Sequence, residues 1–299
     1  MIVPDGRGSG PGKNEQAGLS DRENFLRRTG SAAVLAPLAI AVAFVGGWIF
    51  VAACLVTAAL VLWEWSILVA RAADWRILAP GLPALCVAAV LAHGPWPGMA
   101  IAAVALGALA AALVAAAPQP QPDQPPAGAG WAAAGVVYAG VLLISPILLR
   151  SDPQLGFAAL AFLFATVWAT DIFAYFAGRS LGGPLLAPRL SPKKTWSGAA
   201  GGLAGGVVAG AVVAYASAGT HPAAAGVLAL ILSIAAQGGD LLESSVKRRF
   251  GAKDTSALIP GHGGVMDRVD GFLVAALIAI VIGALRFDAA ASAQGLLLW

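Results

Sequence analysis

Long apolar runs, repeated from Ser31 to the end of the chain, constrain the fold more than any other feature of this sequence. Apolar residues make up 59% of the chain and charged residues only 11%, against about 45–50% and about 25% in soluble domains. A helix crosses a bilayer with about 20 predominantly apolar residues. The chain is therefore predicted to be an all-α integral membrane protein.

By length, about nine transmembrane helices are predicted, with eight to ten as the range. The first and third runs are short enough to be re-entrant, and Gly46 with Gly47 breaks the first hairpin. The Pro-rich stretch 118–130 is predicted to be an extramembrane linker. The predicted spans are 31–46, 48–70, 78–93, 98–117, 131–149, 156–177, 198–218, 223–241 and 271–287.

Basic residues gather on one side of this predicted bundle. If the polar start of the chain is inside, the even-numbered turns face the cytoplasm, and three of those four turns are the basic ones. The opposite side carries little beyond Arg150 and Arg286. The N-terminus and the polar turns are thus predicted to be cytoplasmic.

Several classes of protein lose support. The two cysteines, Cys54 and Cys86, lie in apolar runs and are interpreted as buried side chains without a disulfide or metal. The net charge of +3 is too small to indicate nucleic-acid binding. The P-loop pattern G-x-x-x-x-G-K-[ST], the serine-hydrolase pattern G-x-S-x-G and the zincin pattern H-E-x-x-H are absent.

Two carboxylates lie inside predicted spans, where ionisable groups tend to mark function. Asp171 is interpreted as a site residue, with a structural ion pair to Arg179 as the alternative. Glu64 lies near the end of its span, and we favour a structural ion pair with Arg71.

A second polar segment, LSPKKTWSG at 190–198, precedes a Gly-rich run at 197–210. Its lysines and hydroxyls fit an anion site at a helix start. A positive-inside anchor explains them equally well, and both interpretations stay open. For the Gly-rich run we favour close helix packing over a helix that lines a substrate path.

The strongest polar segment lies at 238–272, where acids and bases alternate between two spans. Asp240 with Glu243, and Asp267 with Asp270, are i, i+3 pairs at two helix ends that could face each other. Carboxylates can hold a hard cation while bases neutralise phosphate oxygens, so Mg²⁺ or another divalent cation is expected.

Segment 244–270 resembles the conserved segment of the phosphatidate cytidylyltransferase family. The likeness extends upstream to Gly239 and Asp240, to 191–196 and to the D-x-x-A-Y stretch 171–175, and it covers about 171–272. The positions that match are Ser244, Lys247, Arg248, Lys253, Asp254, Pro260, His262, Gly263, Gly264, Asp267, Arg268 and Asp270.

The resemblance implies a membrane enzyme that joins CMP from CTP to phosphatidic acid, with CDP-diacylglycerol and pyrophosphate as products. It implies metal binding by Asp240 and Asp267, with Asp171 as a weaker third. The implied catalytic residues are Asp240, Lys247, Arg248, Lys253, Asp254, His262, Asp267, Arg268 and Asp270. The implied substrate-binding residues are Asp171, Ser191, Lys193, Lys194, Thr195 and Ser244.

The chain is then expected to divide into a disordered cytoplasmic tail at 1–30, N-terminal transmembrane helices at 31–150, and a C-terminal transmembrane catalytic domain at 151–299 with its conserved loop at 238–272. A multi-pass protein of the cell (inner) membrane among membrane lipids is expected, without nucleic acid, and a homodimer stays open. The alternatives are another membrane CTP-dependent kinase or transferase acting on polyprenol or diacylglycerol, and an ion-coupled transporter.

Overall fold

The computed structural model describes residues 33–117, 128–256, 258, 263–289 and 291–299. The predicted tail at 1–30 and most of the linker at 118–130 lie outside this part of the chain. After a helix at Ala33–Val45, the elements are α2 (Gly47–Ala70), α3 (Trp75–His93), α4 (Pro97–Ala116), α5 (Ala129–Arg150), α6 (Gly156–Leu181), β1 (Leu185–Ala187), β2 (Ser191–Thr195), α7 (Trp196–Ala218), α8 (Pro222–Arg249), α9 (Met266–Arg286) and α10 (Ser292–Leu297).

Among the described residues, eight helices are long and apolar enough to cross a membrane, which confirms the predicted all-α, multi-span architecture. The run predicted as the first span corresponds to the helix Ala33–Val45, which is shorter than a span. The third span starts earlier than predicted, at Trp75. There Asp74 caps the helix by accepting a hydrogen bond from the Arg76 backbone N–H at 3.0 Å.

The two helices on either side of the polar segment 238–272, α8 and α9, are longer than their apolar runs. α8 continues to Arg249, eight residues beyond the predicted end at 241, and α9 begins at Met266 rather than 271. Hydropathy marks where a helix leaves the membrane and not where the helix ends. An ion pair between Glu243 and Lys247, one turn apart, supports the polar continuation of α8.

Glycines let α6 and α7 approach closely, as predicted for the Gly-rich run. A Cβ atom on Gly202 would lie 2.8 Å from the Thr170 carbonyl oxygen, and one on Gly198 would lie 2.9 Å from that of Ala174. A Cβ atom on Gly206, four residues after Gly202, would likewise meet the Thr170 hydroxyl and the Thr166 carbonyl oxygen on α6. Small residues every fourth position therefore form the face of α7 that packs on α6.

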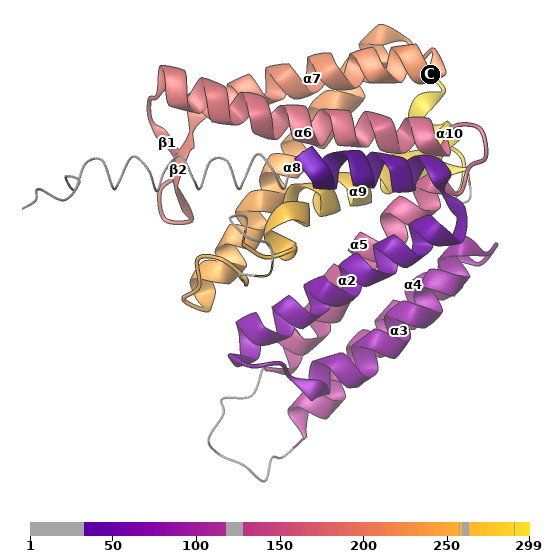
Figure 1. The fold of residues 1–299 in the computed structure, drawn as a ribbon, viewed down its shortest axis with the longest axis vertical. Coiled ribbons are helices and arrows are strands. Elements are labelled where there is room, and N and C mark those ends of the chain that lie inside the picture. The colour runs from indigo at the N-terminus through magenta and orange to yellow at the C-terminus, as the bar shows by residue number, and fades with distance from the viewer. Residues whose placement is uncertain (1–32, 118–127, 257, 259–262, 290) are drawn as a thin grey trace, which may run out of the picture.

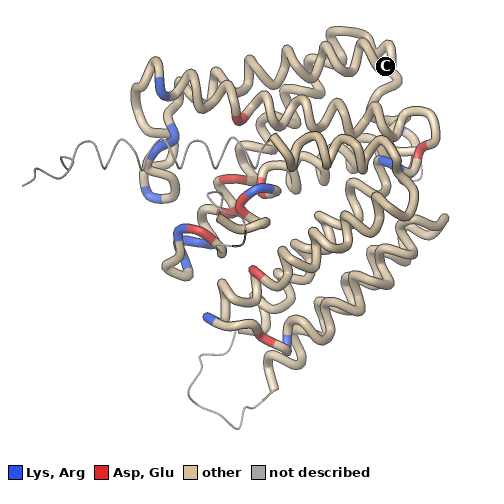
Figure 2. Tube along the Cα trace, viewed as in Figure 1, with Lys and Arg blue, Asp and Glu red and all other residues tan. Residues whose placement is uncertain are grey.

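Figure 1 shows α6 and α7 side by side and α2–α5 as a second group inclined to them, with α8 and α9 between. Figure 2 shows that charged residues gather at one end of the bundle, around the β1–β2 hairpin and the loop between α8 and α9. Contacts bring two of the three basic turns together there: the Arg248 Nε donates to the Leu190 carbonyl oxygen at 3.3 Å, and Lys194 forms an ion pair with Asp240.

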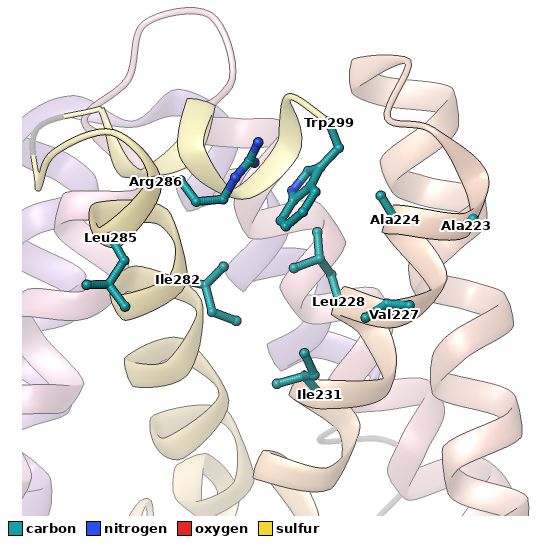
Figure 3. A pocket seen from close by; sticks show the side chains of 9 residues that line it. All are labelled: Ala223, Ala224, Val227, Leu228, Ile231, Ile282, Leu285, Arg286 and Trp299. Carbon is teal, nitrogen blue, oxygen red and sulfur yellow. The ribbon is translucent and has the colours of Figure 1, made fainter.

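An apolar groove of about 530 Å³ opens at the opposite end of α8 and α9. Figure 3 shows Ile282 and Leu228 facing into it, with Arg286 and Trp299 at its rim. Arg286 stacks on the Trp299 ring, 3.6 Å from its centroid. Along α8 the lining residues of this groove, Ala223 to Ile231, lie roughly 13 to 25 Å from Asp240, given the 1.5 Å rise per residue. The polar segments therefore belong to a separate site.

Candidate functional site

Two glycines bring α8 and α9 into backbone contact at the polar end. A Cβ atom on Gly239 would lie 2.5 Å from the Asp270 carbonyl oxygen, and one on Gly271 would lie 3.0 Å from that of Ala236. Each glycine is the immediate neighbour of an acidic residue, Asp240 on α8 and Asp270 on α9. The crossing therefore carries carboxylates from both helices to the same place.

Three carboxylates meet at this crossing. Asp240, Glu243 and Asp270 each offer an oxygen, and these oxygens all lie within 4.8 Å of one another. The buried oxygens of Glu243 accept no hydrogen bond from the described residues, although one of them forms an ion pair with Lys247. Oxygen ligands at this spacing, with buried lone pairs left over, fit a hard divalent cation such as Mg²⁺.

Lys247 joins α8 to α9 beside this group. Its ammonium forms an ion pair with Glu243 and lies 2.6 Å from Oδ1 of Asp267. The other oxygen of Asp267 accepts hydrogen bonds from the Thr255 backbone N–H at 3.1 Å, the Thr255 hydroxyl at 3.0 Å and the Gly264 N–H at 2.8 Å. Asp267 is thus fully engaged by the protein, whereas Glu243 keeps unused acceptor capacity.

The segment LSPKKTWSG reaches the same site as strand β2. Its Lys194 forms an ion pair with Asp240, about one-third exposed, which leaves the lysine accessible to an incoming anion. Thr195 caps α7, because its hydroxyl accepts a hydrogen bond from the Gly198 N–H at 3.1 Å. The Thr195 hydroxyl therefore occupies one of the backbone N–H groups that were expected to bind an anion at this helix start.

Asp171 lies on an exposed face of α6, outside the group of three carboxylates. It is close enough to interact electrostatically with Asp240, Lys194 and Arg268. The alternative pairing with Arg179 is not formed among the described residues. Arg179 instead donates a hydrogen bond to the Tyr175 hydroxyl at 2.9 Å.

The remaining predicted residues, where the structure describes them, are half-buried or exposed. Arg248 donates to the Leu190 and Ala252 carbonyl oxygens, and Ser244 lies half-buried next to Glu243 on α8. His262 and Pro260 lie outside the described residues. The other predicted residues are Ser191, which is half-buried, and Lys193, Lys253, Asp254 and Arg268, which are exposed.

The expected ion pair between Glu64 and Arg71 is wrong. Glu64 is fully buried and accepts hydrogen bonds from the Ser256 hydroxyl at 2.6 Å and the backbone N–H groups of Val265 and Met266 at 2.9 and 2.7 Å. These partners lie about 200 positions further along the chain, so no local sequence pattern could indicate the contact. Glu243 was visible in the sequence as the i, i+3 partner of Asp240, yet nothing there distinguished it as a candidate cation ligand.

The fold and the site together define a multi-pass membrane protein whose acids and bases meet at one end of its helices. The sequence pattern of the cytidylyltransferase family matches residues 26–285, and the chain belongs to this family.

Three relatives, each named phosphatidate cytidylyltransferase, illustrate the similarity. The protein of Brucella abortus biovar 1 (strain 9-941) is 47% identical over 146 residues, which are 49% of this chain and 54% of the relative. That of Haemophilus influenzae is 42% identical over 129 residues, 42% of this chain and 45% of the relative. That of Bacillus subtilis is 37% identical over 126 residues, 42% of this chain and 47% of the relative. The chain thus matches about half the length of these curated relatives.

Proposed function

We propose that this chain transfers CMP from CTP to phosphatidic acid and releases pyrophosphate, so that CDP-diacylglycerol becomes available for phospholipid synthesis. The observation that carries the proposal is the meeting of Asp240, Glu243 and Asp270 with Lys194 and Lys247 at one end of a membrane bundle. The names of the relatives support the same reaction.

Asp240, Glu243 and Asp270 would hold the divalent cation, which when bound neutralises charge on phosphate oxygens. Lys194 is placed to bind a phosphate of CTP or of the lipid, since it lies about one-third exposed beside the acidic group. Lys247 is nearly buried between Glu243 and Asp267, so its role is to fix the carboxylates.

In the proposed reaction no protein side chain forms a covalent bond with either substrate. An anionic oxygen of phosphatidic acid forms a bond to the α-phosphorus of CTP, and the bond to the β-phosphate oxygen breaks, which releases pyrophosphate. Because the nucleophile is already ionised, no strong base is required. The protein contributes by holding two polyanions in line and by neutralising charge on the leaving group.

The location of the site suits these substrates. A site at the end of membrane-spanning helices lets the lipid keep its acyl chains in the bilayer while CTP arrives from water. The basic turns at this end favour a cytoplasmic orientation in the inner membrane. The exposed apolar face of α6 around Phe173 and Phe176 leaves room for either lipid or a second copy of the chain.

The test is formation of CDP-diacylglycerol by the purified protein in detergent, supplied with CTP, phosphatidic acid and Mg²⁺. Product from the unchanged protein, none with EDTA, and about a hundredfold less from folded Asp240→Asn would support the proposal. No product from folded, unchanged protein across several lipids and cations would overturn it.

A second comparison decides which carboxylates hold the cation. Sequence resemblance favours Asp267 and Asp171 beside Asp240, whereas proximity favours Glu243 and Asp270. Mn²⁺ binding, measured by electron paramagnetic resonance on Asp171→Asn, Asp267→Asn, Glu243→Gln and Asp270→Asn, separates the two sets. We expect the last two variants to lose the most affinity.

A further inference from the structure

A carboxylate from the N-terminal half of the chain supports the site, although every candidate ligand lies in the C-terminal half. Glu64 lies on α2 between two tryptophans and is fully buried. A buried carboxylate is costly unless it is fully hydrogen-bonded. The partners that satisfy Glu64 are therefore informative about its role.

Glu64 caps α9 from outside that helix. The first residues of a helix carry backbone N–H groups without an intrahelical acceptor, and the helix dipole favours negative charge there. Val265, at the cap position, contributes no capping side chain. Instead Glu64 accepts hydrogen bonds from the N–H groups of Val265 at 2.9 Å and Met266 at 2.7 Å.

The same carboxylate also fixes the loop before α9. The Ser256 hydroxyl donates to Glu64 at 2.6 Å, and the Thr255 hydroxyl lies 3.4 Å from it. Thr255 in turn donates to Asp267 through its backbone N–H and, at 3.0 Å, its hydroxyl. Thr255 therefore connects Glu64 directly to the acidic residue that holds Lys247.

Gly264 shows how closely this arrangement is packed. A Cβ atom at position 264 would lie 2.6 and 2.7 Å from the two oxygens of Glu64 and would also meet the Thr255 hydroxyl. The Gly264 N–H meanwhile donates to Asp267 at 2.8 Å. Only a residue without a side chain allows both acidic groups to engage the same turn.

We infer that Glu64 is a positioning residue, which holds the first turn of α9 and so places Asp267 and Asp270 against α8. It touches none of the three carboxylates that we propose for the cation and acts through the helix that carries Asp270. The cation-binding part of this inference rests on the proposed function. The N-terminal helices are then part of the architecture of the site and more than a membrane anchor.

The test compares Glu64→Gln with Asp152→Asn, each purified in detergent as the full chain. Asp152 is a matched control: it is buried, accepts hydrogen bonds from the backbone N–H groups of Gln154 and Leu155 just before α6, and lies at the other end of the bundle. The readouts are Mn²⁺ affinity by electron paramagnetic resonance and hydrogen exchange of the amides at 264–270.

For Glu64→Gln we expect Mn²⁺ affinity and turnover to fall about 10- to 100-fold, as for residues that orient metal ligands, together with faster exchange at 264–270. Asp152→Asn is expected to keep the affinity of the unchanged protein. Faster exchange with unchanged Mn²⁺ affinity would make Glu64 purely structural and overturn the inference.

Two outcomes separate this inference from the proposed reaction. If the unchanged protein binds Mn²⁺ but makes no CDP-diacylglycerol, the proposed function fails and the comparison of affinities still decides the role of Glu64. If Glu64→Gln does not fold, Ser256→Ala carries the test, because it removes one hydrogen bond to the carboxylate. A several-fold loss of Mn²⁺ affinity is expected there, and no loss would overturn the inference.

Discussion

Gly239 on α8 lies directly against the backbone of Asp270 on α9. A Cβ atom added at position 239 would lie only 2.5 Å from the Asp270 carbonyl oxygen. This contact sets the distance between the two helices that carry the acidic group. Any side chain at position 239 must push the helices apart or shift one along the other.

Replacing Gly239 with alanine is therefore expected to lower stability by about 1–3 kcal/mol, the usual cost of overpacking, and to weaken Mn²⁺ binding. The measurement is thermal unfolding in detergent together with a Mn²⁺ titration. Gly238→Ala is the matched control, since a Cβ atom there meets nothing within 4 Å. Equal behaviour of the two variants would contradict the close contact.

Replacing Lys247 with methionine is expected to destabilise the protein by about 3–5 kcal/mol, because two buried carboxylates lose their counter-charge. The side chain of Lys247 is 11% exposed, and those of Glu243 and Asp267 are 1% and 6% exposed. Unfolding in mixed micelles measures the change. Arg189→Met, at an exposed position on the β1–β2 hairpin, should stay within about 0.5 kcal/mol.

The pair Lys247→Met with Glu243→Gln should recover part of the lost stability, since one uncompensated charge is removed. Mn²⁺ affinity should stay low, because the double variant also lacks a proposed ligand. A double variant that recovers both properties would show that Glu243 serves the ion pair alone.

Replacing Thr195 with alanine is expected to lower stability by about 1 kcal/mol through loss of the cap on α7, while Thr195→Ser retains it. Thermal unfolding of the two variants is the measurement. If CTP also binds this hydroxyl, Thr195→Ala raises the KM for CTP beyond its effect on folding. Identical stability of the alanine and serine variants would contradict the capping role.

The apolar pattern predicted the class of fold, because a bilayer fixes both the length and the composition of a span. It placed helix ends less well where polar residues continue a helix, as in α8 after 241 and α9 before 271. The β1–β2 hairpin, which pairs Leu185 with Thr195 and Ala187 with Ser191, had no sequence signal beyond a polar turn.

The sequence alone determined which residues carry charge in a chain that has few of them, and the i, i+3 spacing that put Asp240 beside Glu243 and Asp267 beside Asp270. Only the tertiary structure decided how these pairs combine. The crossing of α8 and α9 at Gly239 and Gly271 brings Asp270 next to Asp240 and Glu243. Asp267 forms an ion pair with Lys247 instead. The tertiary structure also brought Glu64 to the start of α9. This contact joins distant segments of the chain because a buried carboxylate needs hydrogen-bond donors and the first N–H groups of a helix need an acceptor.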